Sequence, residues 1–162
     1  MIKEVSGDLL LTGAQVIAHG VAPNDSFGSG LAQQLRTNWP AMYKDFRHYC
    51  HGNHPKPGGL WAWMGADGRH VINLFTQEAA YHPGERPGRA TTQYVGHALK
   101  ALRQLIEAEQ FTSVALPRLA TGLGGLEWGD VKSLVEQHLG DLKIPVIVYA
   151  TYHANQKAAE GL

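Results

Sequence analysis

The stretch ALPRLATGLGGLEWGDVKSLVEQHL, which begins at Ala115, most strongly limits how this chain can fold. It opens as an apolar run, passes through a turn that holds Gly122, Gly124 and Gly125, and continues as a helical pattern from about Trp128. An apolar run followed by a turn and a 3.6-residue periodicity predicts a strand that leads directly into a helix. A chain built from such units folds as an α/β layer structure.

The same alternation of strands and helices runs along the rest of the chain. Short apolar runs bounded by turn residues predict strands at residues 2–5, 15–19, 60–64, 71–75, 113–116 and 146–151. Apolar stripes predict helices within residues 31–46, which Pro40 divides into two, and at 95–106 and 131–139, with a stop at Gly140. We therefore expect one α/β domain over residues 1–162, with helices around a largely parallel or mixed sheet.

Composition and charge exclude several classes of protein. The chain of 162 residues has 14 basic and 14 acidic residues, so its formal net charge is zero. This balance argues against a generic nucleic-acid surface or a surface for anionic membranes. The single cysteine, Cys50, cannot form an internal disulfide, which fits a reducing, cytoplasmic location. We expect no membrane segment, because no apolar run approaches the roughly 18 residues that one needs.

Two strand–glycine turn–helix units suggest what the chain binds. The first is VIAHGVAPNDSFGSGLAQQL and the second is the stretch quoted above. Glycines at a helix N-terminus leave backbone N–H groups open to an anionic ligand, and two adjacent loops can cradle a diphosphate. The alternative is that these are ordinary turn glycines. Neither unit is a P-loop or a G-x-G-x-x-G dinucleotide fingerprint, which disfavours a nucleotide hydrolase or a nicotinamide-dependent enzyme.

Four segments in order resemble those of macrodomains, the ADP-ribose-binding modules. They are VSGDLL, GSGLAQQL, ALPRLATGLGGLEW and PVIVYAT, and together they extend over nearly the whole chain. The resemblance implies a three-layer α/β/α sandwich with a central mixed sheet and ADP-ribose in a cleft above it. It implies ADP-ribose and mono-ADP-ribosylated proteins as partners. We expect no cofactor, no metal and a monomer.

The resemblance also assigns roles to individual residues. Asp8, with Leu9, matches the position that binds the adenine amino group, and Tyr152 can flank the adenine ring. Residues of the two loops would surround the diphosphate and distal ribose, with His19 and Gln77 beside them. The loop residues are Gly28, Ser29, Gly30 and Leu31 in the first loop and Thr121, Gly122, Leu123, Gly124 and Gly125 in the second.

Within the family, IAHGVAPNDSFGSGLA and NLFTQ resemble the ADP-ribosyl-glutamate hydrolases and the ADP-ribose-1″-phosphate phosphatases. The hydrolases have a lysine where this chain has Gln77 and an aspartate where it has Gly124. Glutamine is not a nucleophile of that kind, so a lysine–sugar adduct is not expected here. A hydrolytic route remains open, because a carboxylate with a pKa of about 4 leaves readily and the reaction then needs chiefly a positioned water.

Four residues are catalytic hypotheses. His82 or Glu85, in the loop after the fourth strand, can orient a water as general base, and Asp25 can face the distal ribose. His19 would assist in a phosphatase; the alternative is a buried histidine satisfied by the loop backbone. Arg86 can pair with a phosphate. A solvated surface loop is the alternative for the residues of that segment.

A cluster of three histidines, His48, His51 and His54, precedes Pro55 and Pro57 and predicts an irregular loop. It lacks a completing set of ligands, so we expect no metal site. Three functions stay open: hydrolysis of mono-ADP-ribose from acidic protein side chains, hydrolysis of ADP-ribose-1″-phosphate, and binding of ADP-ribose without chemistry.

Overall fold

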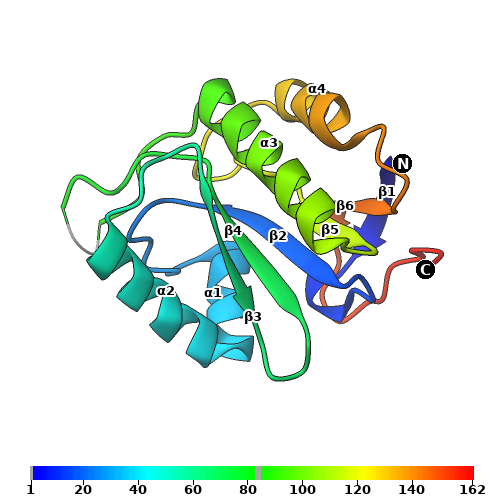
Figure 1. The fold of residues 1–162 in the computed structure, drawn as a ribbon, viewed down its shortest axis with the longest axis horizontal. Helices are drawn as coiled ribbons and strands as arrows, with labels where there is room; N and C mark the ends of the chain where they lie inside the picture. Colours follow the sequence, from blue (N-terminus) through cyan, green and yellow to red (C-terminus); the bar gives the residue numbers. More distant parts are fainter. Residues whose placement is uncertain (1, 83–84) are drawn as a thin grey trace.

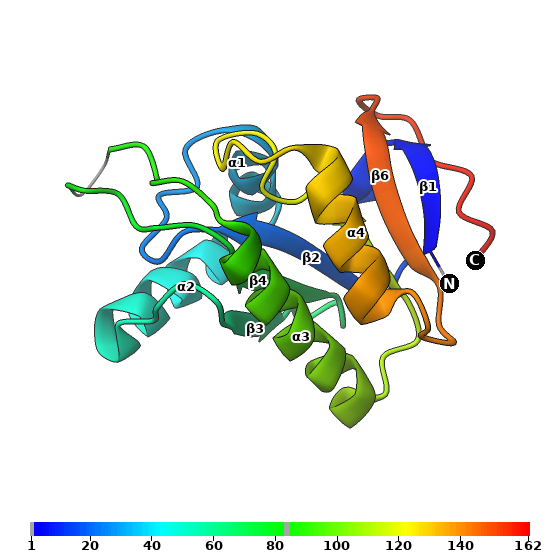
Figure 2. The same ribbon diagram turned by 90° about the horizontal axis from the view of Figure 1, so that it is seen from above.

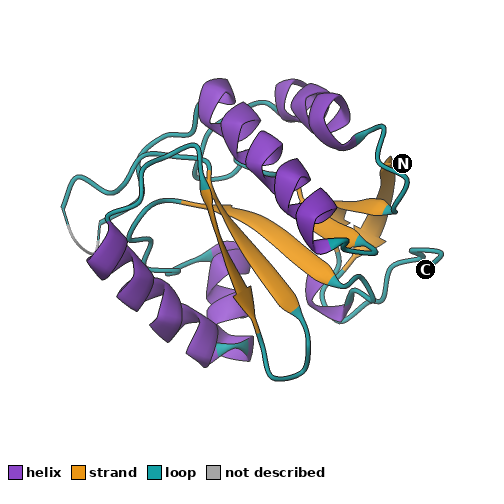
Figure 3. Cartoon of the chain, viewed as in Figure 1, coloured by secondary structure: helices purple, strands orange, loops and turns teal. Residues whose placement is uncertain are grey.

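The computed structural model describes residues 2–82 and 85–162, and within them six strands form one sheet. The strands lie in the order β1-β6-β5-β2-β4-β3, and every neighbouring pair is parallel except β3 and β4 (Figures 1 and 3). The sheet is therefore mixed, as the sequence predicts. The strands are β1 (Ile2–Gly7), β2 (Val16–Val21), β3 (Leu60–Met64), β4 (His70–Phe75), β5 (Val114–Pro117) and β6 (Val146–Tyr152).

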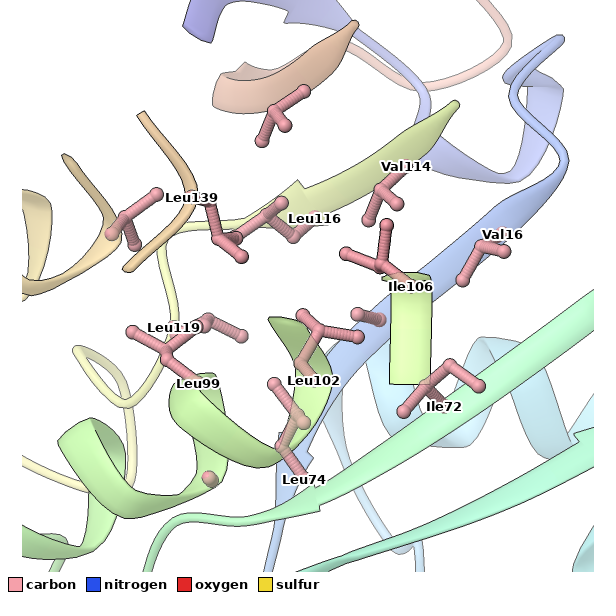
Figure 4. Packing of buried hydrophobic residues seen from close by; sticks show 14 of the residues in the cluster. Val16, Ile72, Leu74, Leu99, Leu102, Ile106, Val114, Leu116, Leu119 and Leu139 are labelled. Carbon is pink, nitrogen blue, oxygen red and sulfur yellow. The ribbon is translucent and has the colours of Figure 1, made fainter. Parts of the chain in front are cut away.

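Helices cover both faces of this sheet and make the three layers. One face carries α1 (Gly30–Asn38) and α2 (Pro40–Asn53), and the other carries α3 (Thr92–Glu109) and α4 (Trp128–Leu139) (Figure 1). A short 3-10 turn, η1 (Leu9–Leu11), follows β1. Alternation along β2 fills the two cores: Val16 and Ala18 pack toward α3 and α4, whereas Ile17 packs toward α1 and α2. Figure 4 shows Val16 with Leu99, Leu102 and other residues of the core on the α3 and α4 side.

Most elements begin and end within two or three residues of their predicted bounds. Pro40 starts α2 as its first residue, because proline is tolerated in the first turn of a helix but not in its interior. The largest error concerns His48 and His51, for which the sequence predicted an irregular loop. They lie inside α2, which ends only at Asn53, where His54 adopts a left-handed cap. Pro55 and Pro57 thus follow the helix rather than break it.

The parallel strands bring all the candidate residues to one edge of the sheet. Asp8 follows β1, the first glycine loop follows β2, Gln77 follows β4, the second glycine loop follows β5, and β6 ends at Tyr152. Figure 2 shows the loops after β2 and β5 on the same side of the molecule. This edge is where α/β sheets bind ligands. Within the described residues, none of the helices is long and apolar enough to cross a membrane.

Candidate functional site

Two connected clefts lie over the carboxyl edge of the sheet. The β6 cleft, of about 310 Å³, is lined by Asp8, Leu9, Tyr149 and Tyr152 among others. The loop cleft, of about 580 Å³, lies between the two glycine loops. Both clefts include Gly30, Leu31 and Pro117 in their walls, so they form one elongated site.

Contacts with the core anchor the first glycine loop on one side and leave its backbone exposed on the other. Phe27 is fully buried, and its ring centroid lies 4.8 Å from that of Phe46. The Asp25 carboxylate accepts hydrogen bonds from the N–H groups of Ala22 (3.0 Å) and Phe27 (2.9 Å). Within the part of the chain that the structure describes, the Ser29 side chain makes no capping hydrogen bond to α1. The first N–H groups of α1 are therefore open to a ligand.

The second glycine loop depends on the absence of a side chain at Gly124. This residue is buried, and its carbonyl accepts a hydrogen bond from Ala90 N–H at 3.1 Å. A Cβ atom here would lie 2.6 Å from the Ala120 carbonyl oxygen and 2.9 Å from Ala90 Cβ. Ala120 itself has a left-handed φ of 62°, which folds the loop back on itself. This backbone thus has no room for the aspartate of the hydrolase pattern.

Gln77 joins the end of β4 to the returning loop. Its side chain is buried, and Nε2 donates to the Gly88 carbonyl at 3.1 Å. Its backbone forms an isolated bridge with Ala90, and Glu78 N–H donates to the Arg89 carbonyl at 3.1 Å. Gln77 therefore lines the loop cleft as a fixed amide that also anchors the loop before α3.

His19 lines the loop cleft as a neutral imidazole. It is almost completely buried, and its Nε2 lies 2.6 Å from Asn73 Oδ1. Asn73 Nδ2 donates to the Trp61 carbonyl at 3.4 Å, so Oδ1 faces the ring and Nε2 carries the proton. Burial lowers the pKa of His19 to about 4. Near neutral pH the ring can accept a hydrogen bond through Nδ1, but it is not a cationic acid.

Comparison with known structures identifies the fold. The chain superposes on the macrodomain of Thermus aquaticus DarG with a TM-score of 0.79 and 27% identity, over 93% of this chain and 98% of that one. It also superposes on Thermosipho africanus DarTG in complex with ADP-ribose, with a TM-score of 0.78 and 22% identity, over 96% of this chain and 42% of that one. The chain has the macrodomain fold.

Curated relatives of this macrodomain are hydrolases in name. This chain is 28% identical over 153 residues to the DNA ADP-ribosyl glycohydrolase of Thermus aquaticus. The match covers 92% of this chain but 41% of that protein. The chain thus spans about two fifths of that relative's length. Human ADP-ribose glycohydrolase OARD1 is 24% identical over 149 residues, covering 91% and 90% of the two chains. An ADP-ribose 1″-phosphate phosphatase of Chaetomium globosum is 28% identical over 166 residues, covering 89% and 88%. No family model matches the sequence.

Most residues that the sequence singled out gather in the two clefts of the macrodomain. Within the part of the chain that the structure describes, His82 lines neither cleft. Its ring packs against the ring of Tyr81, with centroids 4.8 Å apart. Thr121 and Gly125 shape the second loop without lining either cleft, Thr121 through a bond from Oγ1 to the Arg118 carbonyl at 2.9 Å. The residues placed at the clefts are Asp8, Leu9, His19, Asp25, Gly28, Ser29, Gly30, Leu31, Gln77, Glu85, Arg86, Gly122, Leu123, Gly124 and Tyr152.

Asp8 is tied into the macrodomain more firmly than an exposed turn carboxylate would be. It is buried, and its two oxygens accept from Leu10 N–H (3.1 Å) and Asn155 N–H (3.0 Å). The bond from Asn155 makes the segment after β6 part of the site. The sequence also missed Pro117, the last residue of β5, and Tyr149, which lies within β6 as the register partner of Pro117. The end of β5 at the shared edge is the signal that could have found Pro117.

The neutral state of His19 predicts how stability depends on pH. In the unfolded chain the imidazole takes up a proton below about pH 6.5, whereas in the folded macrodomain it does so only near pH 4. Stability is therefore lost as the pH falls from 6.5 toward 4, by about 3 kcal/mol at about 1.4 kcal/mol per pH unit. We expect urea denaturation to show this extra loss for the wild type relative to His19→Gln. Equal losses in the two proteins would contradict the assignment.

Proposed function

We propose that this macrodomain is an ADP-ribosyl hydrolase. ADP-ribose lies with its adenine in the β6 cleft and its diphosphate and distal ribose in the loop cleft, and water cleaves the bond from the distal ribose to the acceptor. The continuity of the two clefts carries the proposal, because a ligand of this length must contact both glycine loops at once. The names of the relatives, all of them ADP-ribose hydrolases or phosphatases, support it.

Two carboxylates that line the loop cleft have different expected roles. The Asp25 oxygens are held by two backbone N–H groups, so Asp25 supplies a fixed negative charge for a sugar that becomes cationic in the transition state. Glu85 also lines this cleft, and its side chain makes no hydrogen bond within the part of the chain that the structure describes. Glu85 is therefore the better choice to orient and deprotonate water.

The route uses no covalent intermediate. Gln77 replaces the lysine of the hydrolase pattern, and its amide nitrogen is engaged with Gly88. Water must then attack the sugar carbon directly while the acceptor departs. For an ester of an acidic side chain, the leaving carboxylate has a pKa of about 4 and needs little acid assistance. This matches the absence of a cationic acid at His19.

Two acceptors are candidates, and only the first of them leaves as a carboxylate with a pKa of about 4. Acidic side chains of mono-ADP-ribosylated proteins follow from the resemblance to glutamate hydrolases, and DNA is favoured by the name of the Thermus aquaticus relative. The test is release of ADP-ribose from a glutamate-modified protein and from ADP-ribosylated single-stranded DNA, side by side. A phosphatase would instead release phosphate from ADP-ribose-1″-phosphate, and a reader would bind ADP-ribose without turnover.

A further inference from the structure

The segment after β6, residues 153–162, runs back beside β1 and bonds to the end of that strand (Figure 2). His153 N–H donates to the Gly7 carbonyl at 3.0 Å, and Asp8 N–H donates to the Gln156 carbonyl at 2.7 Å. The two backbones are so close that a Cβ atom on Gly7 would lie 2.8 Å from the Gln156 carbonyl oxygen. A glycine at the end of β1 therefore makes room for the segment.

One carboxylate of this segment bonds to three groups on neighbouring elements. Glu160 Oε1 accepts from Gly13 N–H at 2.8 Å. Its Oε2 accepts from the hydroxyl of Tyr149 at 2.8 Å and from that of Thr12. Burial and the bond to Glu160 raise the pKa of Tyr149 to about 12, so this hydroxyl keeps its proton and donates. Tyr149 and Thr12 are both buried, so removal of the carboxylate takes the acceptor from two buried hydroxyls.

The segment reaches the β6 cleft at two points. Asp8 and Tyr149 both line the cleft. Glu160 holds the hydroxyl of Tyr149, and Asn155 N–H donates to Asp8 Oδ2 at 3.0 Å. The other oxygen of Asp8 accepts from Leu10 N–H at 3.1 Å. The direction of the Asp8 carboxylate in the cleft is thus set by one bond from η1 and one bond from the segment after β6.

A carboxylate of fixed direction can discriminate between bases. It accepts hydrogen bonds and donates none, so it favours a ligand group that carries an N–H. Adenine has an amino group where hypoxanthine has a carbonyl oxygen. We infer that Glu160 is a positioning residue for base recognition: it fastens the segment after β6, and the segment aims Asp8 at the adenine amino group. This inference rests on the proposed function, which places adenine in the β6 cleft.

The experiment measures two affinities by isothermal calorimetry, for ADP-ribose and for inosine diphosphate ribose, in which hypoxanthine replaces adenine. The wild type should bind ADP-ribose about tenfold more tightly, because the carbonyl of hypoxanthine cannot donate to a carboxylate. In Glu160→Ala this preference should fall to about threefold or less, chiefly through weaker binding of ADP-ribose. A loss of packing alone would weaken both ligands alike and leave the preference as it is.

Two further variants complete the test. Gly7→Ala displaces the segment from its other end and should lower the same preference, because the added Cβ meets the backbone of Gln156. Glu136→Ala, at an exposed position of α4, is the matched control and should keep both affinities.

The outcomes separate this inference from the proposed function. If the wild type does not bind ADP-ribose, the proposed function fails. If it binds both ligands equally, or if Glu160→Ala keeps the wild-type preference, the positioning role is refuted while the proposed function stands. Should Glu160→Ala not fold, Gly7→Ala decides by the same criterion.

Discussion

Gly124→Val is expected to lower the affinity for ADP-ribose at least 100-fold. A Cβ at this position would lie 2.6 Å from the Ala120 carbonyl oxygen, and backbone atoms cannot move away as a flexible side chain can. The loop must then open, and the hydrogen bonds from Ala90 N–H to Gly124 and from Leu126 N–H to Ala120 are strained. Backbone donors that converge on a diphosphate lose their geometry together, which is why a large effect is expected. Isothermal calorimetry with ADP-ribose measures it.

Gly129→Ala is the matched control for Gly124. Gly129 is exposed on α4, and an added Cβ there meets no heavy atom within 4 Å. Alanine should stabilise the helix by about 0.5–1 kcal/mol and leave ADP-ribose binding as it is. Thermal unfolding followed by circular dichroism checks that Gly124→Val is still folded. A folded Gly124→Val protein with wild-type affinity would refute the role of the second loop.

Glu85→Gln is expected to reduce the turnover number about 10²- to 10⁴-fold while ADP-ribose affinity stays near that of the wild type. The substitution keeps the size of the side chain but removes the base that takes a proton from water. Glu109→Gln at the exposed end of α3 is the control and should leave the turnover number unchanged. Single-turnover release of ADP-ribose, with the variant in excess of substrate, measures the chemical step directly.

Asp25→Asn should behave differently from Glu85→Gln, and the contrast tests the two roles. Asparagine cannot accept from both Ala22 N–H and Phe27 N–H through two oxygens, so the first loop loosens. Both ADP-ribose affinity and turnover should then fall. If Glu85→Gln turns over normally and Asp25→Asn loses turnover alone, Asp25 rather than Glu85 activates water.

The fold was predictable because its signals are local. Apolar runs such as VINLF and PVIVYA and the stripes of the helices are repeated along the chain, and each points to the same layered arrangement. The candidate site was predictable where glycines marked the loops. The contribution of Tyr149 and the burial of Asp8 were not, because Tyr149 lines the cleft from within β6 and Asp8 is held by Asn155, which follows β6.

The C-terminal part of α2 could not be predicted in the same way. Pro55 and Pro57 are typical of loops, so the sequence predicts an irregular segment around His48 and His51. In the structure both prolines follow the end of α2, and the helix continues to Asn53.

The most direct test of the central claim is release of ADP-ribose by catalytic amounts of the purified protein. A glutamate-modified protein and ADP-ribosylated single-stranded DNA are incubated separately with a small molar fraction of the macrodomain, and free ADP-ribose is followed over time. The account predicts many turnovers on at least one substrate, all of them lost in Glu85→Gln. Tight ADP-ribose binding with no release from either substrate would contradict it and identify the chain as a reader or, if ADP-ribose-1″-phosphate is cleaved, a phosphatase.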